Sequence, residues 1–382
     1  MKLCWLVALA ACGKHGALAA QRDGGAAARL DAAAAAVAPF DAAPAPEKPV
    51  PAKLVVGPEL ACAVLSDKTL KCWPGPVKVL ALHGVLDVAI GDAHACALLD
   101  DGSVTCWGAI AYGATPLAGP TAVPGVNDAK RVFALGGASC AGEASGALTC
   151  WGDVDAAGHV TATGARRAPT AVRGLAHVAA LTPHAALLEG GDVVMADGKH
   201  AGTTNVVELA ADSAFTCGRL DDNSVECFGA DQPCATDPTR PAKPVARPKH
   251  GKPAKPAKPA KPAKPPAVRI EKLAGLTPAL HLAFDAGLCA VTPVEHLLCR
   301  DPAAACAALR PPPIANIVET AGHCARLGDG TVQCWTGSTV TTVRGVAHAT
   351  QLAASGEHAC ALLADHSITC WGDGRAPRSI SY

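Results

Sequence analysis

Cysteine is the reactive residue whose spacing is most regular in this chain. Of the 18 cysteines, fourteen form seven pairs whose members stand ten positions apart. The pairs are Cys62 with Cys72, Cys96 with Cys106, Cys140 with Cys150, Cys217 with Cys227, Cys289 with Cys299, Cys324 with Cys334, and Cys360 with Cys370. Thiols at such a spacing can form disulfides, bind a metal ion, or pack as small buried apolar groups.

The residues between the two cysteines of a pair favour a disulfide. In Cys-Ala-Leu-Leu-Asp-Asp-Gly-Ser-Val-Thr-Cys (96–106), the segment 100–102 supplies the aspartate and glycine of a tight turn. Folding about Asp101 sets Cys96 opposite Cys106 across an antiparallel pair of strands. Zinc sites normally use closely spaced cysteine or histidine pairs, which do not occur here. We therefore predict one disulfide in each hairpin, with buried free thiols as the alternative.

An eighth unit tests this pairing. The segment 184–197 aligns with the others through Leu187, Leu188 and Gly191, and it holds Ala185 and Met195 where the two cysteines would stand. The joint loss of both cysteines is expected if a cysteine without its partner is a liability. It supports the disulfide interpretation.

Three further cysteines have separate interpretations. Cys234 and Cys306 each stand seven residues after the second cysteine of neighbouring units, which predicts a bridge between them; the alternative is a free thiol in each loop. Cys12 ends the sequence Leu9-Ala10-Ala11-Cys12, which follows a basic start and a short apolar run and resembles a bacterial lipoprotein signal. We expect cleavage before Cys12 and acylation of its thiol; an ordinary secretory signal is the alternative.

The strands that position the cysteines recur as a repeat. A short strand ending in a turn, such as 123–126 or 343–346, precedes an apolar strand, and the cysteine hairpin follows, so each unit holds four short strands. This pattern predicts an all-β fold, a β-propeller of seven to eight four-stranded blades, with eight hairpin units counted. The first unit, starting near residue 53, lacks a lead-in strand. We expect the C-terminal strand, within 376–382, to supply it and close the ring.

The units resemble the repeats of the regulator of chromosome condensation family. Its pattern of Gly, often His, then Ala-Leu-Leu-x-Asp-Gly-x-Val-x-x-Trp-Gly is clearest here at 91–108 and 356–372. The resemblance covers about residues 54–382 and implies a propeller used as a binding platform. Eight hairpins exceed the family's usual seven blades. Nothing matches the wedge that the eukaryotic exchange factor uses, so nucleotide exchange is not implied.

Aromatic residues make up only 3% of the chain, and five of its six tryptophans directly follow the second cysteine of a pair. These are Trp73, Trp107, Trp151, Trp335 and Trp371. We expect them to pack blade against blade; a tryptophan-lined carbohydrate site is the alternative.

Composition divides the chain into a signal peptide (1–11), an Ala/Pro-rich tether (12–52) and the propeller (53–382), which a basic Lys-Pro-Ala insertion interrupts at 239–267. The insertion has nine Lys or Arg and no acidic residue. It is either a solvated spacer or an arm that contacts an anionic polymer. The contact residues would include Lys249, Lys252, Lys255, Lys258, Lys261 and Lys264. Without aromatic residues between the lysines, sequence-specific nucleic-acid binding is not expected.

No catalytic set stands out in the sequence. His94, His323 and His358 recur just before a cysteine, which favours structural imidazoles over ligands or bases. No Ser/His/Asp set, paired carboxylates or metal motif is apparent, so no cofactor, metal or enzyme activity is expected. The chain is expected to be a monomeric, lipid-anchored binding module at the bacterial cell envelope, with an envelope protein as partner. The alternatives are a binder of anionic cell-wall polysaccharide and an enzyme with its site in the propeller channel.

Overall fold

The computed structural model describes residues 48–73, 82–109, 119–154, 166–196, 198–211, 216–229, 269–272, 278–284, 288–293, 296–301, 307–308, 313–337, 339–356, 358–372 and 375–380. All of them belong to one compact unit, Lys48–Tyr382. The signal peptide, Cys12, Cys234, Cys306 and the insertion 239–267 lie outside the described residues. Among the described residues, no helix is long and apolar enough to cross a membrane.

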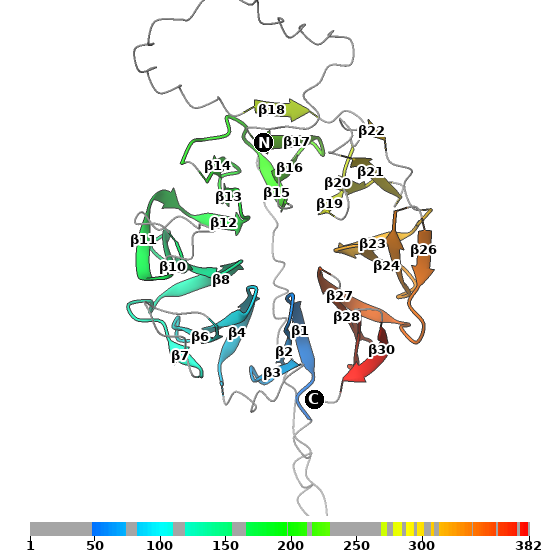
Figure 1. Ribbon diagram of the computed structural model, residues 1–382, viewed down its shortest axis with the longest axis horizontal. Helices are drawn as coiled ribbons and strands as arrows, with labels where there is room; N and C mark the ends of the chain where they lie inside the picture. The colour runs from blue at the N-terminus through cyan, green and yellow to red at the C-terminus, as the bar shows by residue number, and fades with distance from the viewer. Residues whose placement is uncertain are drawn as a thin grey trace, which may run out of the picture. The chain divides into compact units, whose positions relative to one another are not determined.

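The described residues form eight small antiparallel sheets that follow one another around a ring, and we call them blades 1 to 8 (Figure 1). Blade 1 contains β1 (Pro51–Val56), β2 (Ala61–Leu65) and β3 (Leu70–Trp73); blade 2 contains β4 (Val85–Ile90), β5 (His94–Leu99), β6 (Val104–Gly108) and β7 (Thr121–Ala122). Blade 3 contains β8 (Ala129–Leu135), β9 (Ala138–Glu143), β10 (Ala147–Asp153) and β11 (Arg166–Ala176); blade 4 contains β12 (Val178–Leu181), β13 (Ala185–Leu188) and β14 (Val193–Met195).

Blade 5 contains β15 (Val206–Ala211), β16 (Thr216–Leu220), β17 (Val225–Gly229) and β18 (Arg269–Lys272); blade 6 contains β19 (His281–Phe284), β20 (Leu288–Val291), β21 (Leu297–Asp301) and β22 (Ala307–Ala308). Blade 7 contains β23 (Ile317–Ala321), β24 (Cys324–Leu327), β25 (Val332–Thr336) and β26 (Thr339–Thr342); blade 8 contains β27 (Ala349–Ser355), β28 (His358–Leu363), β29 (Ile368–Gly372) and β30 (Arg375–Ile380). The fold is therefore an all-β propeller.

The cysteine hairpins of blades 1, 2, 3, 5, 7 and 8 are built on three-residue loops. In blade 2, the Leu99 carbonyl accepts the N–H of Gly102, and Gly102 adopts a φ of 81°. The Asp101 carboxylate accepts both the backbone N–H and the hydroxyl of Ser103, at 2.9 and 2.7 Å. The hydroxyl bond and the backbone bond hold the pKa of Asp101 below its usual value. The sequence Asp-Asp-Gly-Ser thus encodes both the turn and its stabilising contacts.

This turn sets the register that brings the cysteines together. Cys96 lies opposite Cys106 in the ladder of β5 and β6, and the corresponding pairs lie opposite each other in six further blades. The described residues contain seven disulfides, which join Cys62 to Cys72, Cys96 to Cys106, Cys140 to Cys150, Cys217 to Cys227, Cys289 to Cys299, Cys324 to Cys334, and Cys360 to Cys370. The predicted pairing is confirmed, and in blade 4 Ala185 lies opposite Met195, as the alignment required.

The structure corrects the predicted assignment of the fourth strand. The lead-in strand β7 pairs with β6, so it is the outer strand of the preceding blade. The Val123 N–H continues this pairing by donating to the Val104 carbonyl at 2.8 Å. The tight turn from Val123 to Val126 then leads to the inner strand of the next blade. In the same way, β30 follows the hairpin of blade 8 and pairs with β29 as the outer strand of that blade. It does not complete blade 1, so the predicted closure by the C-terminal strand is not observed.

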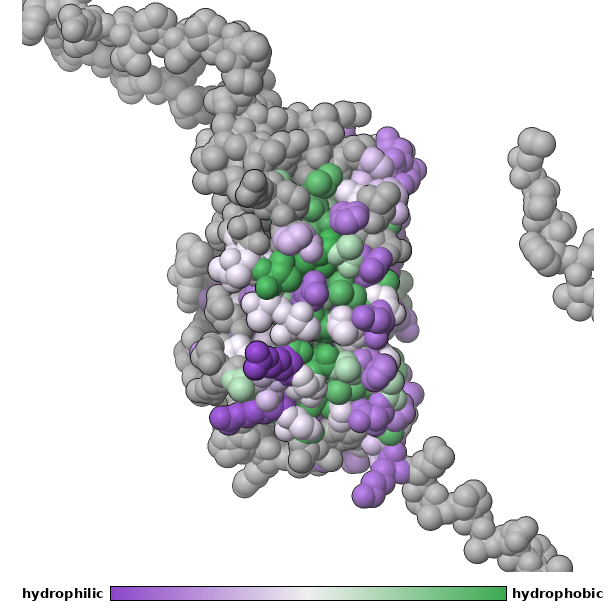
Figure 2. All heavy atoms as spheres, turned by 90° about the vertical axis from the view of Figure 1, so that its right-hand side faces the viewer, coloured by the Kyte–Doolittle hydropathy of each residue, from purple (hydrophilic) through white to green (hydrophobic). Residues whose placement is uncertain are grey.

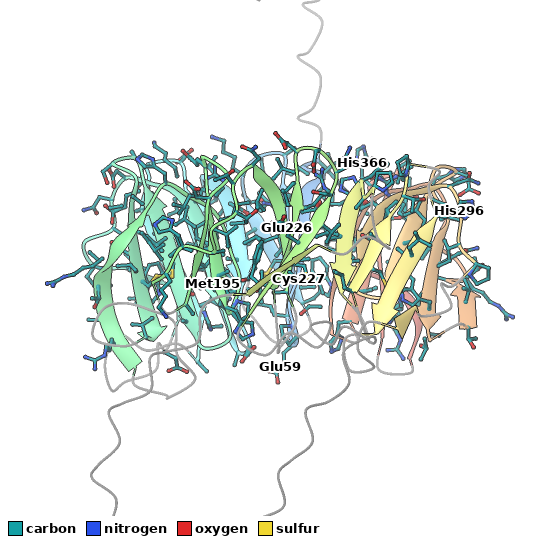
Figure 3. The ribbon with its side chains drawn as sticks, turned by 90° about the horizontal axis from the view of Figure 1, so that it is seen from above. Glu59, Met195, Glu226, Cys227, His296 and His366 are labelled. Atoms are coloured by element: carbon teal, nitrogen blue, oxygen red, sulfur yellow. A yellow bond between two sulfur atoms is a disulfide. The ribbon has the colours of Figure 1, made fainter. Side chains whose placement is uncertain are left out.

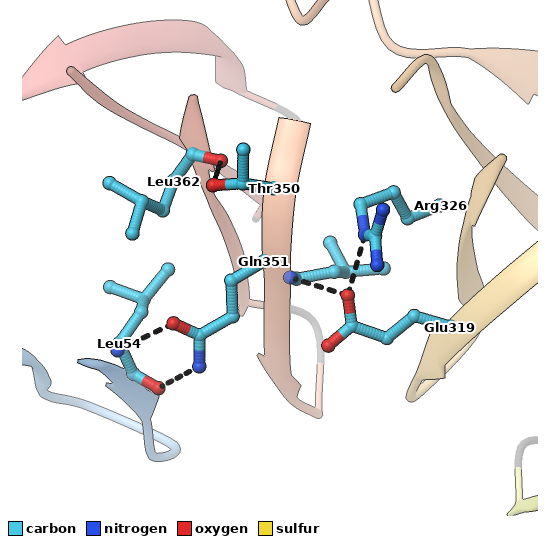
Figure 4. Close-up of polar contacts among 7 residues, drawn as sticks. Leu54, Glu319, Arg326, Thr350, Gln351 and Leu362 are labelled. Carbon is cyan, nitrogen blue, oxygen red and sulfur yellow. Dashed lines mark hydrogen bonds and ion pairs between the residues drawn. The ribbon is translucent and has the colours of Figure 1, made fainter. Parts of the chain in front are cut away.

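Ring closure instead depends on packing between blades 1 and 8. Leu54 and Ala63 of blade 1 share one buried apolar cluster with Leu362 and Ile368 of blade 8. Gln351 of β27 adds two hydrogen bonds: its Oε1 accepts the Leu54 N–H at 3.0 Å, and its Nε2 donates to the Leu54 carbonyl at 3.2 Å (Figure 4). The seam is therefore joined by side chains and not by a shared sheet.

Candidate functional site

In six of the eight blades, the aromatic residue after the second cysteine joins the blade to the one before it; the same position holds Ala196 in blade 4 and Arg300 in blade 6. Trp151 of blade 3 has no exposed surface and shares a core cluster with Cys96 and Cys106 of blade 2. The same arrangement occurs at six interfaces, through Trp73, Trp107, Trp151, Phe228, Trp335 and Trp371. The predicted packing of tryptophans between blades is confirmed, and a disulfide forms part of the surface beneath most of these rings.

The interface between blades 3 and 4 has no such ring. Ala196 stands at the aromatic position, and a cavity of ≈ 70 Å³ lies beside it. The cavity is lined by apolar residues of both blades, among them Leu148, Cys150, Leu181 and Met195. Figure 3 shows Met195 at mid-height in the ring, seen from the side.

A larger cavity of ≈ 250 Å³ lies at the seam between blades 1 and 8. Two tryptophans, Trp73 and Trp371, line it together with three ionisable residues, Glu59, His358 and Arg378. Figure 3 places Glu59 at the face of the ring opposite His366, which belongs to a hairpin turn. An apolar hollow with a few convergent polar groups is the usual form of a ligand site.

The two tryptophans that line the seam cavity differ in their hydrogen bonds. The Nε1 of Trp371 is buried and has no hydrogen-bond partner in the described part of the chain. By contrast, the Nε1 of Trp73 donates to the Cys370 sulfur at 3.2 Å.

The pair of His94 and Ser139 resembles part of a catalytic set but is structural. His94 Nε2 lies 2.7 Å from the Ser139 hydroxyl, across the interface of blades 2 and 3. Burial lowers the pKa of His94 to about 4, although Asp92 and Asp153 act in the opposite direction. The side chains are only 4% and 1% exposed. A substrate therefore has no access to this pair in the folded ring.

His94 also accounts for the glycine that opens the repeat. A side chain at Gly91 would overlap the imidazole ring of His94. The Gly-x-x-His pattern at 91–94 thus places the imidazole ring of His94 against the backbone of Gly91, where a side chain would not fit. The sequence-based interpretation of His94 as a satisfied structural imidazole agrees with this geometry.

The surface of the described residues carries large apolar side chains at three separate positions. Among the described residues these are Leu86, Val207 and Val318, which occupy the same irregular position in the inner strands of blades 2, 5 and 7. Figure 2 views the rim from the side of β26 and β30 and shows apolar side chains interspersed with hydrophilic ones. Single exposed apolar residues are normal on soluble domains and do not mark a patch.

The sequence profile of the regulator of chromosome condensation (RCC1) repeat matches residues 85–113 and 349–376. These segments contain the inner strand and the cysteine hairpin of blades 2 and 8. The chain is an RCC1-like β-propeller. This fold is typical of protein-interaction modules, and its seven described disulfides indicate a secreted or extracellular protein.

Several solved structures are similar to this RCC1-like propeller. The CRINKLY WD40 ectodomain of the Arabidopsis thaliana receptor kinase ACR4 is 17% identical, with a TM-score of 0.43, over 87% of this chain and 99% of that one. Prp20p from Saccharomyces cerevisiae is 14% identical, with a TM-score of 0.42, over 78% and 77%. BamB from Moraxella catarrhalis is 13% identical, with a TM-score of 0.38, over 85% and 96%. No curated protein matches the sequence.

The RCC1-like propeller brings together fourteen of the predicted site residues, the cysteines of the seven described disulfides. Cys12, Cys234, Cys306 and the six lysines of the insertion lie outside the described residues. Within the described residues, no group of three His, Cys, Asp or Glu side chains is arranged to hold a metal ion. Sequence reasoning missed both cavities. The cavity beside Ala196 was detectable, because an alanine stands where six of the aligned units carry tryptophan or phenylalanine and the seventh carries Arg300.

Proposed function

We propose that this propeller is a secreted, lipid-anchored, non-catalytic protein-binding module at the bacterial cell envelope. The observation that carries the proposal is that seven described hairpins each contain a disulfide. Disulfides persist in oxidising compartments and are rare in the cytosol. The lipoprotein-like sequence ending at Cys12 supports the anchor. A ring with covalently closed hairpins supports a rigid binding platform, which loses little conformational entropy on binding.

The intact mass of the protein from its native membrane fraction tests this proposal. We expect a chain that begins at Cys12, carries a diacyl or triacyl mass increment, and takes up alkylating label at its paired cysteines only after reduction. Replacement of Cys12 by serine should release the protein from the membrane fraction without changing its disulfides. An unprocessed chain with freely alkylated thiols would contradict both the proposed secretion and the envelope function.

The basic insertion favours a second candidate function, binding of an anionic envelope polysaccharide. Nine positive charges without an acidic residue attract a polyanion, and such attraction falls as salt rises. Deletion of 239–267 should abolish salt-sensitive binding to the polysaccharide. The matched control replaces six lysines by glutamine and keeps the length: Lys249, Lys252, Lys255, Lys258, Lys261 and Lys264. If the glutamine variant binds as well as the native chain, charge does not drive binding and this candidate fails.

A further inference from the structure

The interface between blades 3 and 4 keeps the backbone of the aromatic position but not its ring. The Trp335 N–H donates to the His323 carbonyl at 2.8 Å, and the Ala196 N–H donates to the His184 carbonyl at the same distance. Ala196 therefore occupies the place from which a tryptophan elsewhere reaches the preceding blade. The difference between the two interfaces is the missing indole.

The vacated space is apolar and reaches the surface. Leu148 and Cys150 of blade 3 form one wall, and Val194 and Met195 of blade 4 form another. Ala196 is exposed, whereas Trp151 at the equivalent place is fully buried. A space of ≈ 70 Å³ is several times larger than a water molecule needs, and its mostly apolar lining favours an apolar ring.

Two glycines line this cavity at turns. Gly174 and Gly198 both line it, both have positive φ values, and no atom would lie within 4 Å of a Cβ built on either. The approach to the cavity is thus open along two bare turns. Arg173, also exposed, lies beside the opening, where a guanidinium can stack on an aromatic face.

We propose that this cavity binds an aromatic side chain, tryptophan or phenylalanine, of a partner polypeptide. The inference rests on the proposed protein-binding function and names the group that the propeller recognises. Six other interfaces of the same propeller place tryptophan or phenylalanine at this position. The residues around the position therefore already fit an aromatic side chain. The cavity is only large enough for the end of a side chain, and the flexible thioether of Met195 can move to admit a larger ring.

In the test, the protein as isolated from its host is titrated with a capped pentapeptide that has tryptophan at its centre and alanine at the other four positions. Binding is followed by NMR chemical shifts of the Gly174 and Gly198 backbone amides, which line the cavity in every variant, with the all-alanine peptide as the ligand control. We expect saturable shifts with the tryptophan peptide alone. Ala196→Trp should fill the cavity and weaken binding by more than about tenfold, and Met195→Ala should enlarge the cavity and strengthen binding.

A surface tryptophan elsewhere is the matched protein control. Val207→Trp adds an indole on an exposed position of blade 5, and it should leave peptide binding unchanged. Ala196→Trp should also raise the melting temperature, whereas Val207→Trp should not. Equal binding by the native protein and by Ala196→Trp, or no binding by the native protein and Met195→Ala, would overturn the proposal.

Titration with free indole distinguishes two possible ligands of the cavity, an aromatic side chain of a partner polypeptide and a small aromatic molecule. Indole that binds as tightly as the peptide would assign the cavity to a small molecule and overturn the partner side chain. The result is independent of the mass experiment. A lipid-modified protein that ignores the peptide would refute this inference alone, and a cytosolic protein that binds it would refute only the envelope function.

Discussion

The side-chain amide of Gln351 forms two hydrogen bonds with the backbone of Leu54, although 297 residues separate the two in the chain. Its Oε1 and Nε2 satisfy the N–H and the carbonyl of one residue, which is the two-point contact that an unpaired strand edge needs. Equivalent inner-strand residues make related contacts at other interfaces. Glu319 accepts the Leu352 N–H at 3.1 Å (Figure 4), and Glu208 accepts the Leu282 N–H at the same distance.

Removal of this contact should loosen the seam. Gln351→Ala leaves the N–H and carbonyl of Leu54 without these partners, and we expect a loss of about 1–2 kcal/mol in the free energy of unfolding. Hydrogen exchange at the Leu54 amide should accelerate more than exchange in blade 5. The control is Gln333→Ala, whose amide makes one long contact of 3.5 Å with Thr342 on the surface. Equal effects of the two substitutions would show that Gln351 does not close the ring.

His94 should make stability depend on pH between about 4 and 6.5. Burial lowers its pKa from 6.5 to about 4, so in this window the unfolded chain binds a proton that the folded chain does not. Stability should therefore fall as pH decreases from 6.5 and level off, for this residue, below pH 4. The total effect is about 3 kcal/mol by the linkage relation.

Urea unfolding at several pH values measures this effect in the native protein and in His94→Gln. The glutamine variant should lose the slope between pH 4 and 6.5, although it is less stable at neutral pH. The control is His177→Gln, because the side chain of His177 is 63% exposed. A slope that persists in His94→Gln would assign the pH dependence to other groups.

Gly102 should be intolerant of a side chain for two separate reasons. Its φ of 81° disfavours other residues, and a Cβ would lie 2.8 Å from the Asn127 carbonyl oxygen of the connection to blade 3. We expect Gly102→Ala to lower the free energy of unfolding by about 2–3 kcal/mol. Gly125→Ala is the matched control, because Gly125 has a φ of 80° but no atom within 4 Å of its Cβ position. Its cost should be about 1 kcal/mol, and equal costs in urea unfolding would rule out the steric contribution.

The part of the fold that sequence predicts well is the part fixed by local chemistry. The turn at 100–102 and the alternation of buried residues determine which side chains face each other, so the cysteine register followed from the ten-residue spacing together with the turn residues. The prediction that placed the outer strand in the following blade was wrong. A short strand followed by a Val-x-Gly-Val turn has the same sequence pattern whether the strand ends one sheet or begins the next. Its partner is settled by a hydrogen bond from Val123 to Val104, and periodicity does not encode that bond.

The contacts between blades were harder to predict for a different physical reason. Gln351, Glu319 and Glu208 are ordinary polar residues on strands, and their backbone partners lie 297, 33 and 74 positions away. The packing of consecutive blades brings Glu319 and Glu208 to their partners, and only the closure of the ring brings Gln351 to Leu54. The cavity at Ala196 is the opposite case, because a repeat alignment reveals a missing side chain even when no residue there carries any chemical signal.

Blade 4 should accept the disulfide that it lacks. Ala185 lies opposite Met195 in the same ladder position as the seven cysteine pairs, so Ala185→Cys with Met195→Cys places two thiols on a backbone already in register. We expect an eighth hairpin disulfide that raises the free energy of unfolding by about 1–2 kcal/mol, below the loop-entropy value of about 3 because the hairpin is local. Alkylation before and after reduction should find two more protected thiols than in the native protein. The control, Ala185→Ser with Met195→Ser, should be destabilised under both oxidising and reducing conditions. Free thiols in the cysteine variant after oxidative refolding would show that the ladder of blade 4 does not match its seven counterparts.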